Sequence, residues 1–178
     1  AAGADVIVPV HKGLEETRRC LDSVPAFPQR TAREIVVVDD CSPEPELAGW
    51  LRELAETGAI TLLENPANTG FVNAVNRSMI LHPDRDVVLL NSDTEVHGDW
   101  LDRLRRHAYS DPQVGTVTPF TNNGTICGYP RFNRDNPLPE DWPLAAMDRA
   151  FAEVNAGSSV ELPTAVGFCM YIRRDCLN

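Results

Sequence analysis

Polar side chains that can bind a cation or a phosphate follow three apolar runs of the chain. In chain order these side chains and their neighbours are Pro9, Val10 and His11, then Asp39 and Asp40, then Asn91, Ser92 and Asp93. Carboxylates gathered at one edge of a sheet repel one another unless a cation or hydrogen-bond donors lie between them. Oxygen ligands favour Mg²⁺ or Mn²⁺, which bind one or two carboxylates together with substrate phosphates. The three clusters therefore predict a divalent-metal and phosphate site.

Each acidic cluster also has a plainer explanation. Asp39 and Asp40 can merely solvate a strand end, and Asn91 or Asp93 can cap a turn. For either cluster alone the two explanations are evenly matched. Their joint position after apolar strands favours one shared site, because ligands of open parallel sheets bind at the carboxyl ends of the strands.

The elements that would position these clusters alternate between strand-like and helical patterns. Strands are expected at Asp5 to Val10, Glu34 to Val38, Ile60 to Leu63, Asp86 to Leu90 and Val114 to Thr118, with late, antiparallel strands at Val160 to Leu162 and Ala165 to Arg173. Helices are expected at Leu14 to Val24, Leu47 to Leu54, Phe71 to Leu81, Trp100 to Ala108 with Asp99 as the N-cap, and Leu144 to Val154. Thr121 to Pro143, rich in Asn, Gly and Pro, reads as a long irregular connection. The alternation predicts an α/β domain with a mainly parallel sheet.

The composition of the chain excludes some classes of function. The 178 residues carry a formal charge of −10 and are 43% hydrophobic, which fits one globular domain and argues against nucleic acid as a partner. The five cysteines show no paired metal spacing, so reduced thiols in the cytoplasm are expected. The chain begins at Ala1 without a Met and stops directly after an apolar segment, so we expect it to be part of a longer protein.

Four motifs in order carry a family resemblance. They are VIVPVH from Val6, IVVVDDCS from Ile35, NTGF from Asn68 and LLNSDT from Leu89. Together they resemble the family 2 glycosyltransferases of the GT-A fold, a three-layer α/β/α domain. The last motif is most similar to the branch that contains rhamnosyl and related transferases of bacterial surface polysaccharides such as O-antigen.

The resemblance implies roles for individual residues on the donor side. Pro9, Val10 and His11 would form the loop beneath the nucleotide. Asp39 and its neighbour Asp40 would accept hydrogen bonds from the base or the ribose. The same resemblance assigns nucleotide-sugar contacts to a further set of residues, namely Asn68, Gly70, Asn91, Ser92 and Asp93.

The metal and the acceptor follow from the same resemblance. Asp93 would hold Mg²⁺ or Mn²⁺, with Asn91 and Glu95 as weaker ligands, because a neutral amide at Asn91 replaces the first acid of the family motif. Gly167 and Phe168 would lie on the acceptor side. Residues 1–118 would then be the nucleotide-binding half of one domain and residues 119–178 an incomplete acceptor-side segment.

The implied reaction is an inverting transfer of a hexose from a UDP-, dTDP- or GDP-linked donor to a saccharide or a lipid-linked acceptor. The family's catalytic base, a carboxylate beyond the late strand, has no counterpart before Asn178, so we expect this stretch to bind donor but to transfer poorly by itself. The expected location is the cytoplasm, with peripheral association of the full-length protein at the inner face of the cell membrane.

Two other functions stay open. One is a non-catalytic nucleotide-binding or assembly module of a multidomain polymerase. The other is a nucleotidyltransferase, which is disfavoured because the loop from Val10 to Leu14 lacks a glycine-rich, arginine-containing sequence. A phospho-acceptor receiver domain fits less well, because its acidic pair should follow the first strand.

Overall fold

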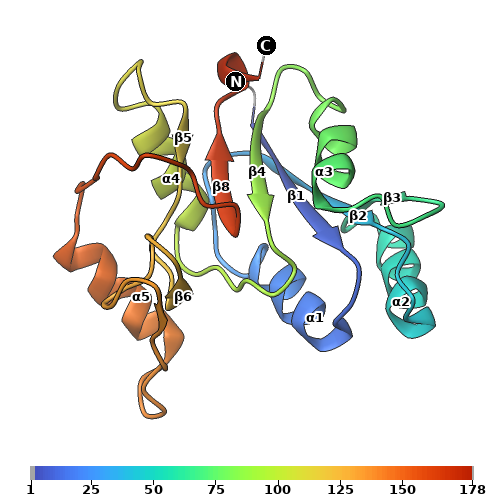
Figure 1. Ribbon diagram of the computed structural model, residues 1–178, viewed down its shortest axis with the longest axis horizontal. Coiled ribbons are helices and arrows are strands. Elements are labelled where there is room, and N and C mark those ends of the chain that lie inside the picture. The colour runs from blue at the N-terminus through green and yellow to red at the C-terminus, as the bar shows by residue number, and fades with distance from the viewer. Residues whose placement is uncertain (1–2, 178) are drawn as a thin grey trace.

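The computed structural model describes residues 3–177 and shows one central sheet with helices on both faces (Figure 1). The strands of this sheet are β1 (Ala4–Val10), β2 (Arg33–Asp39), β3 (Thr61–Glu64), β4 (Asp86–Leu90), β5 (Thr116–Val117) and β8 (Cys169–Ile172). The helices are α1 (Leu14–Ser23), α2 (Pro45–Glu56), α3 (Phe71–Met79), α4 (Trp100–Ala108) and α5 (Leu144–Val154), and a 3-10 turn spans Arg174–Cys176. Strands β6 (Asn123–Gly124) and β7 (Arg134–Asp135) form a separate two-stranded hairpin.

The sheet has the order β3-β2-β1-β4-β8-β5. Strands β1 to β4 are mutually parallel, and β8 is antiparallel to both of its neighbours. The chain moves outward from β1 to β3 and then returns to place β4 on the other side of β1. Strand order therefore reverses between β1 and β4, which is where an open α/β sheet forms a binding crevice.

Two apolar layers hold the helices to the sheet. One layer packs α1, α2 and α4 against β1, β2, β4 and β8, and includes the fully buried Leu47, Leu51 and Leu101. The other packs α3, through Ala74 and Val75, against the opposite face. The strand interiors read as continuous apolar runs because both of their faces are covered.

The late part of the chain departs from the sequence expectation. Only Cys169–Ile172 of the expected Ala165 to Arg173 strand is regular, and β8 lies inside the sheet between β4 and β5. The expected strand at Val160 to Leu162 is wrong, since these residues are exposed coil. Three alternating residues without a partner strand cannot satisfy their backbone groups by pairing.

Asp99 precedes α4, as expected, but its side chain does not cap the helix. It forms ion pairs with Arg103 and Arg106 on the helix instead, at 3.0 and 3.5 Å. Within residues 3–177, no helix has both the length and the apolar composition needed to cross a membrane.

Candidate functional site

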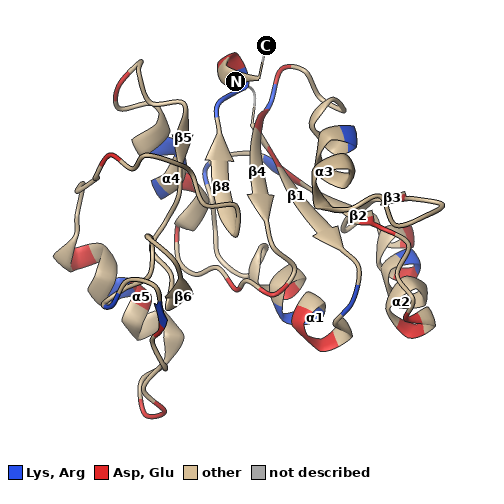
Figure 2. Cartoon of the chain, viewed as in Figure 1, with Lys and Arg blue, Asp and Glu red and all other residues tan. Residues whose placement is uncertain are grey.

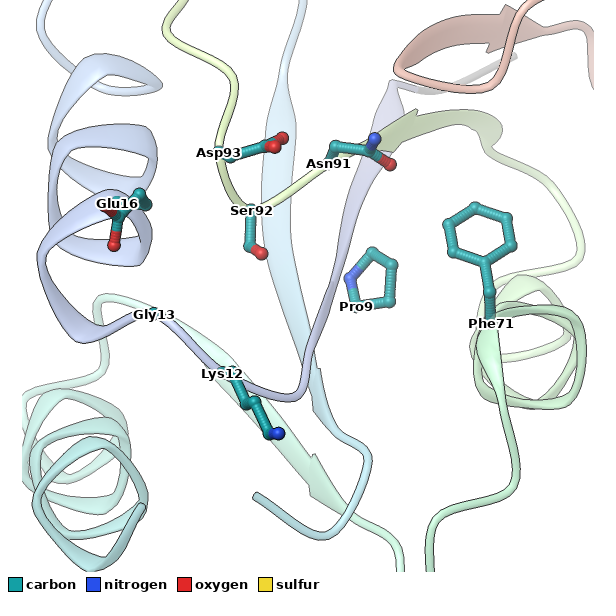
Figure 3. A pocket seen from close by; sticks show the side chains of 8 residues that line it. All are labelled: Pro9, Lys12, Gly13, Glu16, Phe71, Asn91, Ser92 and Asp93. Carbon is teal, nitrogen blue, oxygen red and sulfur yellow. The ribbon is translucent and has the colours of Figure 1, made fainter. Parts of the chain in front are cut away.

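A cavity of about 340 Å³ opens between the carboxyl ends of β1 and β4. Its lining residues are Pro9, Lys12, Gly13, Glu16, Phe71, Asn91, Ser92 and Asp93. Figure 3 shows Phe71 at the start of α3 and Glu16 on α1 on opposite sides of the cavity, with Pro9 between them. The cavity thus lies where the strand order reverses, and it brings together Pro9 with the Asn91–Asp93 cluster.

Asp93 is the free acid of this cavity. Its side chain is exposed and forms no hydrogen bond or ion pair with any residue between 3 and 177. The amide oxygen of Asn91 and the hydroxyl of Ser92 add neutral oxygen ligands, so the donor set fits a hard divalent cation that keeps several waters. Glu95 is less available, because its carboxylate lies 3.3 Å from the guanidinium of Arg19.

The backbone of Asn91 is fixed from two sides. Its N–H donates to the carbonyl of Phe168 at 2.8 Å, and its carbonyl accepts from the Cys20 thiol at 3.4 Å. Burial raises the pKa of Cys20 to about 12, with the Asp93 and Glu95 charges adding to the effect, so the thiol stays protonated and able to donate. Phe168, expected on the acceptor side, therefore lies directly beside the Asn91 turn.

Asp39 and Asp40 lie beside this cavity rather than in its lining. Asp39 pairs with Val10 in the β1–β2 register, and its Oδ1 accepts the Ser42 N–H at 2.7 Å. Asp40 faces residues 65–70: Oδ1 accepts from Asn65 Nδ2, Thr69 N–H and the Thr69 hydroxyl, and Oδ2 accepts from Gly70 N–H, all at 2.8–2.9 Å. Asp40 thus clamps the loop that leads into α3.

The Asp40 clamp has a clear electrostatic signature. Burial opposes ionisation of Asp40, but the hydrogen bonds from Asn65, Thr69 and Gly70 outweigh it and lower the pKa to about 2. The carboxylate therefore stays charged at all ordinary pH values and keeps the loop in place. No metal is needed to offset the repulsion between the neighbouring carboxylates of Asp40 and Asp39, because donors from the loop satisfy both Asp40 oxygens.

His11 and Asn68 meet at the rim of this clamp. The His11 Nδ1 lies 3.1 Å from the carbonyl oxygen of Asp40, and the Asn68 amide nitrogen lies 3.2 Å from His11 Nε2. Asn68 and Gly70 are exposed. The expected nucleotide residues thus form two neighbouring groups on one edge, the β1–β4 cavity and the Asp40 clamp.

A second carboxylate shapes the loop after β1. Both oxygens of Glu44 lie within 3.3 Å of the Gly13 N–H, and Gly13 has a φ of 91°, a left-handed conformation that glycine adopts readily. The Ser42 hydroxyl in turn accepts the Glu44 N–H at 3.1 Å. Glu44 thereby ties the loop that carries Lys12 to the loop after β2.

Sequence reasoning missed Lys12, Gly13, Glu16 and Phe71 in the cavity and Glu44 behind it. Lys12 and Gly13 follow the first strand directly, so the turn after that strand was a usable signal. Glu44 gave no signal, because its partner lies 31 residues away in the sequence.

A different group of ligand-type residues lies at the opposite, amino edge of the sheet. Asp5, Glu34 and His82 offer ligand atoms within 4.8 Å of one another, the kind of grouping that can hold a metal. The Arg85 guanidinium already lies there, 3.1 Å from Asp5 and 2.6 Å from Glu34. A cation would have to displace that charge, and Asp5 and Glu34 stand at the starts of β1 and β2, far from Asp93.

Comparison with solved structures assigns the architecture. The chain is similar to the mannosyltransferase PcManGT from Pyrobaculum calidifontis, solved with GDP-Man and Mn²⁺ (26% identity, TM-score 0.58, 66% of this chain and 35% of that one). It is also similar to GalNAc-T7, solved with UDP, GalNAc and Mn²⁺ (19%, TM-score 0.68, 97% and 35%), and to S. aureus TarS (19%, TM-score 0.54, 78% and 23%). The expected GT-A fold is confirmed, and the chain spans about a third or less of the length of these structures.

The family follows from the sequence match. The model of glycosyl transferase family 2 matches residues 5–178, so the chain belongs to that family, as the four motifs indicated. Comparison with functionally curated proteins gives no match.

Proposed function

We propose that this chain binds a nucleotide-diphospho-sugar at the carboxyl edge of its sheet for inverting transfer of a hexose to a saccharide or lipid-linked acceptor. The observation that carries the proposal is the cavity between β1 and β4, where Lys12 and the unpaired Asp93 line one space. The PcManGT and GalNAc-T7 structures hold GDP-Man and UDP with GalNAc respectively, which supports a nucleotide donor of the same class.

In this proposal each residue of the site contacts a different part of the nucleotide-sugar donor. Asp39 accepts hydrogen bonds from the base or ribose, while Asp40 holds the 65–70 loop against the nucleoside. Pro9, with the backbone of Val10 and His11, forms the floor, and Asn68 and Gly70 let the nucleotide approach the loop closely. Lys12 places a positive charge beside the diphosphate.

The proposed metal ligands are Asp93 and the neutral oxygens of Asn91 and Ser92, with Glu95 in a weaker role. Mg²⁺ or Mn²⁺, when bound, supplies charge neutralisation to the departing nucleoside diphosphate. Both PcManGT and GalNAc-T7 were solved with Mn²⁺. Gly167 and Phe168 lie on the acceptor side in this assignment, and we propose bacterial surface-polysaccharide synthesis, at the inner face of the membrane, as the setting.

The test is a thermal-shift panel of UDP, dTDP, GDP and CDP with and without Mn²⁺ or Mg²⁺. Ligand at about 100 times its dissociation constant should stabilise the chain by roughly 2.7 kcal/mol. We expect a metal-dependent rise in the melting temperature for one base, lost in Asp93→Asn and kept in Asp84→Asn. Asp84 is a matched control because it is also an exposed aspartate but lies in the turn before β4, at the amino edge. A shift that is independent of metal and unchanged in Asp93→Asn would contradict the proposal.

A further inference from the structure

The segment between β5 and α5 carries most of the exposed aromatic rings. Of the six exposed aromatic residues within 3–177, four lie here, namely Phe120, Tyr129, Phe132 and Trp142. In the rest of the chain the large rings of Trp100 and Tyr171 are buried. Four exposed aromatic residues concentrated in 23 residues of the chain suggest a binding surface, whereas isolated exposed rings such as Phe71 and Tyr109 do not.

This segment is ordered from within by polar groups. Asn136 is 5% exposed, and its Nδ2 donates to the carbonyls of Asn122, Arg131 and Arg134 while its Oδ1 accepts the Arg131 N–H. Backbone hydrogen bonds, including Tyr129 N–H to the Thr121 carbonyl at 2.9 Å, close the same loop. The segment that the sequence predicted to be an irregular connection is therefore a loop held together by internal hydrogen bonds. Its polar groups lie inside and its aromatic rings lie outside, which is the reverse of an apolar core.

Two of these four rings, Phe120 and Tyr129, pack together, and Tyr129 also contacts a ring of α5. The ring centroids of Phe120 and Tyr129 are 5.7 Å apart, and those of Tyr129 and Phe151 on α5 are 4.9 Å apart in an edge-to-face arrangement. Phe120 remains 50% exposed and Tyr129 37% exposed. The Tyr129 hydroxyl makes no hydrogen bond within the described residues. Phe151 thus supports Tyr129, which in turn contacts Phe120, and these two exposed rings keep open surface and a free Tyr129 hydroxyl.

The register of the sheet places Phe120 on the same edge as the cavity. Val117 of β5 and Val88 of β4 both pair with Tyr171 of β8, and β5 runs parallel to β4. Phe120 lies three residues beyond Val117, as Asn91 lies three residues beyond Val88. The two strands are two sheet spacings apart, about 10 Å, so the ring platform lies within reach of a short saccharide that begins next to the donor.

We propose that Phe120 and Tyr129, the latter supported by Phe151, form a platform for a pyranose ring of a saccharide acceptor. This inference rests on the proposed function and names the acceptor class for it. The face of an aromatic ring is electron-rich and attracts the C–H face of a sugar, while the Tyr129 hydroxyl can bind a sugar hydroxyl.

The charge of this segment favours a saccharide over a lipid surface as the ligand of the ring platform. Residues 120–142 hold two arginines against three acids, Asp135, Glu140 and Asp141. An anionic membrane surface is recognised by clustered Lys and Arg, which this segment does not contain. A neutral sugar has no such requirement, so the ring platform fits a saccharide.

The test is saturation-transfer NMR with the methyl glycosides of rhamnose, glucose, galactose and N-acetylglucosamine, with and without nucleoside diphosphate and Mg²⁺. We expect at least one glycoside to bind, and Phe120→Leu and Tyr129→Leu each to weaken it about three- to tenfold. Tyr129→Phe should keep part of the affinity, because the ring stays. Phe132→Leu is the matched control, an exposed ring of the same segment outside the packed trio, and should bind as the unmodified chain does.

The outcomes separate this inference from the proposed function. Nucleotide binding without any glycoside signal, or equal losses in Phe132→Leu and Phe120→Leu, overturns the platform and leaves the donor site standing. Glycoside binding that depends on Phe120, in a chain that binds no nucleotide, supports the platform and removes the proposed function. Unfolding midpoints of the leucine variants show whether each fold is intact. Loss of glycoside binding at an unchanged midpoint supports the platform, whereas loss that merely tracks unfolding overturns it.

Discussion

The amino edge of the sheet surrounds its buried acids with hydrogen-bond donors, whereas the carboxyl edge combines the hydrogen-bonded Asp39 and Asp40 with one open acid, Asp93. At the amino edge, Asp5 and Asp86 are fully buried, and each is surrounded by donors. At the carboxyl edge, Asp93 is exposed and has no partner among residues 3–177. Figure 2 shows acidic segments at both ends of the strands, so the position of charge alone does not mark the site.

The amino edge shows what a neutralised acid does. Asp86 accepts from the Tyr109 and Tyr171 hydroxyls and from the Arg174 N–H, which joins β4, α4 and the end of β8. Burial and the hydrogen bond to Asp86 raise the pKa of Tyr109 to about 12 and raise that of Tyr171 as well. Buried acids with complete hydrogen bonding hold the fold together, whereas an unsatisfied acid in a cavity is free to bind a cation.

The largest effect should follow from breaking the Asp86 cluster. Asp86→Ala leaves the buried Tyr171 hydroxyl without its acceptor, and we expect a loss of about 3 kcal/mol in the free energy of unfolding. Urea denaturation measures it, with Asp84→Asn as a near-neutral control. An equal loss in both variants would show that the hydrogen bonds of Asp86 do not matter.

Removing the guanidinium of Arg85 should have the next largest effect. Arg85→Gln leaves the buried Asp5 paired only with His82, and we expect a loss of about 2 kcal/mol. Side-chain hydrogen bonds from Thr61 and Arg85 lower the pKa of Glu34, so its contribution is present above its unfolded pKa and is lost as the pH falls through the folded pKa. Urea midpoints measured across the acid range should show a weaker acid dependence in Arg85→Gln, and an unchanged profile would refute the pairing.

The hydrogen bonds of Asp40 predict that the stability of the fold falls over a distinct range of acidic pH. The pKa of Asp40 is lowered from 3.8 to about 2, so the clamp stabilises the fold above pH 3.8 and loses that contribution as the pH falls toward 2. Asp40→Asn should cost about 1–2 kcal/mol near neutral pH and remove this part of the acid dependence. Thermal melts between pH 2 and pH 5 provide the comparison, and parallel profiles for the two chains would contradict the clamp.

The smallest effect concerns Glu44. Glu44→Gln keeps the size of the side chain but weakens the charge-assisted hydrogen bond to Gly13, and we expect a loss of about 0.5–1 kcal/mol. Nucleotide affinity should fall more than stability does, because Lys12 precedes Gly13 in the cavity wall. Calorimetric titration with the nucleotide from the thermal-shift panel checks this. An unchanged affinity would show that Glu44 does not position the loop.

The sequence predicted most of the first half of the fold because local patterns determine it. The runs that became β1, β2 and β4 are continuously apolar in their interiors, and α1 to α4 follow their periodic stripes. Register and partners are long-range properties, so the position of β8 inside the sheet could not be read from residues 169–172. The isolated apolar residues at 160–162 resembled a strand only because nothing local shows the absence of a partner.

The candidate site was partly predictable for the same reason. Polar residues after apolar strands identify the carboxyl edge, and this placed Pro9 and Asp93 in one region. Sequence alone does not show which acid is already satisfied. In the sequence Asp40 and Asp93 are both aspartates that follow an apolar strand. Only the structure shows that residues 65–70 donate hydrogen bonds to Asp40, whereas Asp93 remains open to a ligand.

The most direct test of the account is a Mn²⁺ titration followed by amide NMR in the presence of the nucleotide that binds. We expect paramagnetic broadening that is strongest at, and centred on, the amides around Lys12 and Asn91 to Asp93, and its loss in Asp93→Asn. Broadening centred on Asp5, Glu34 and His82 would contradict it, because the neutralised edge would then be the one that binds the metal.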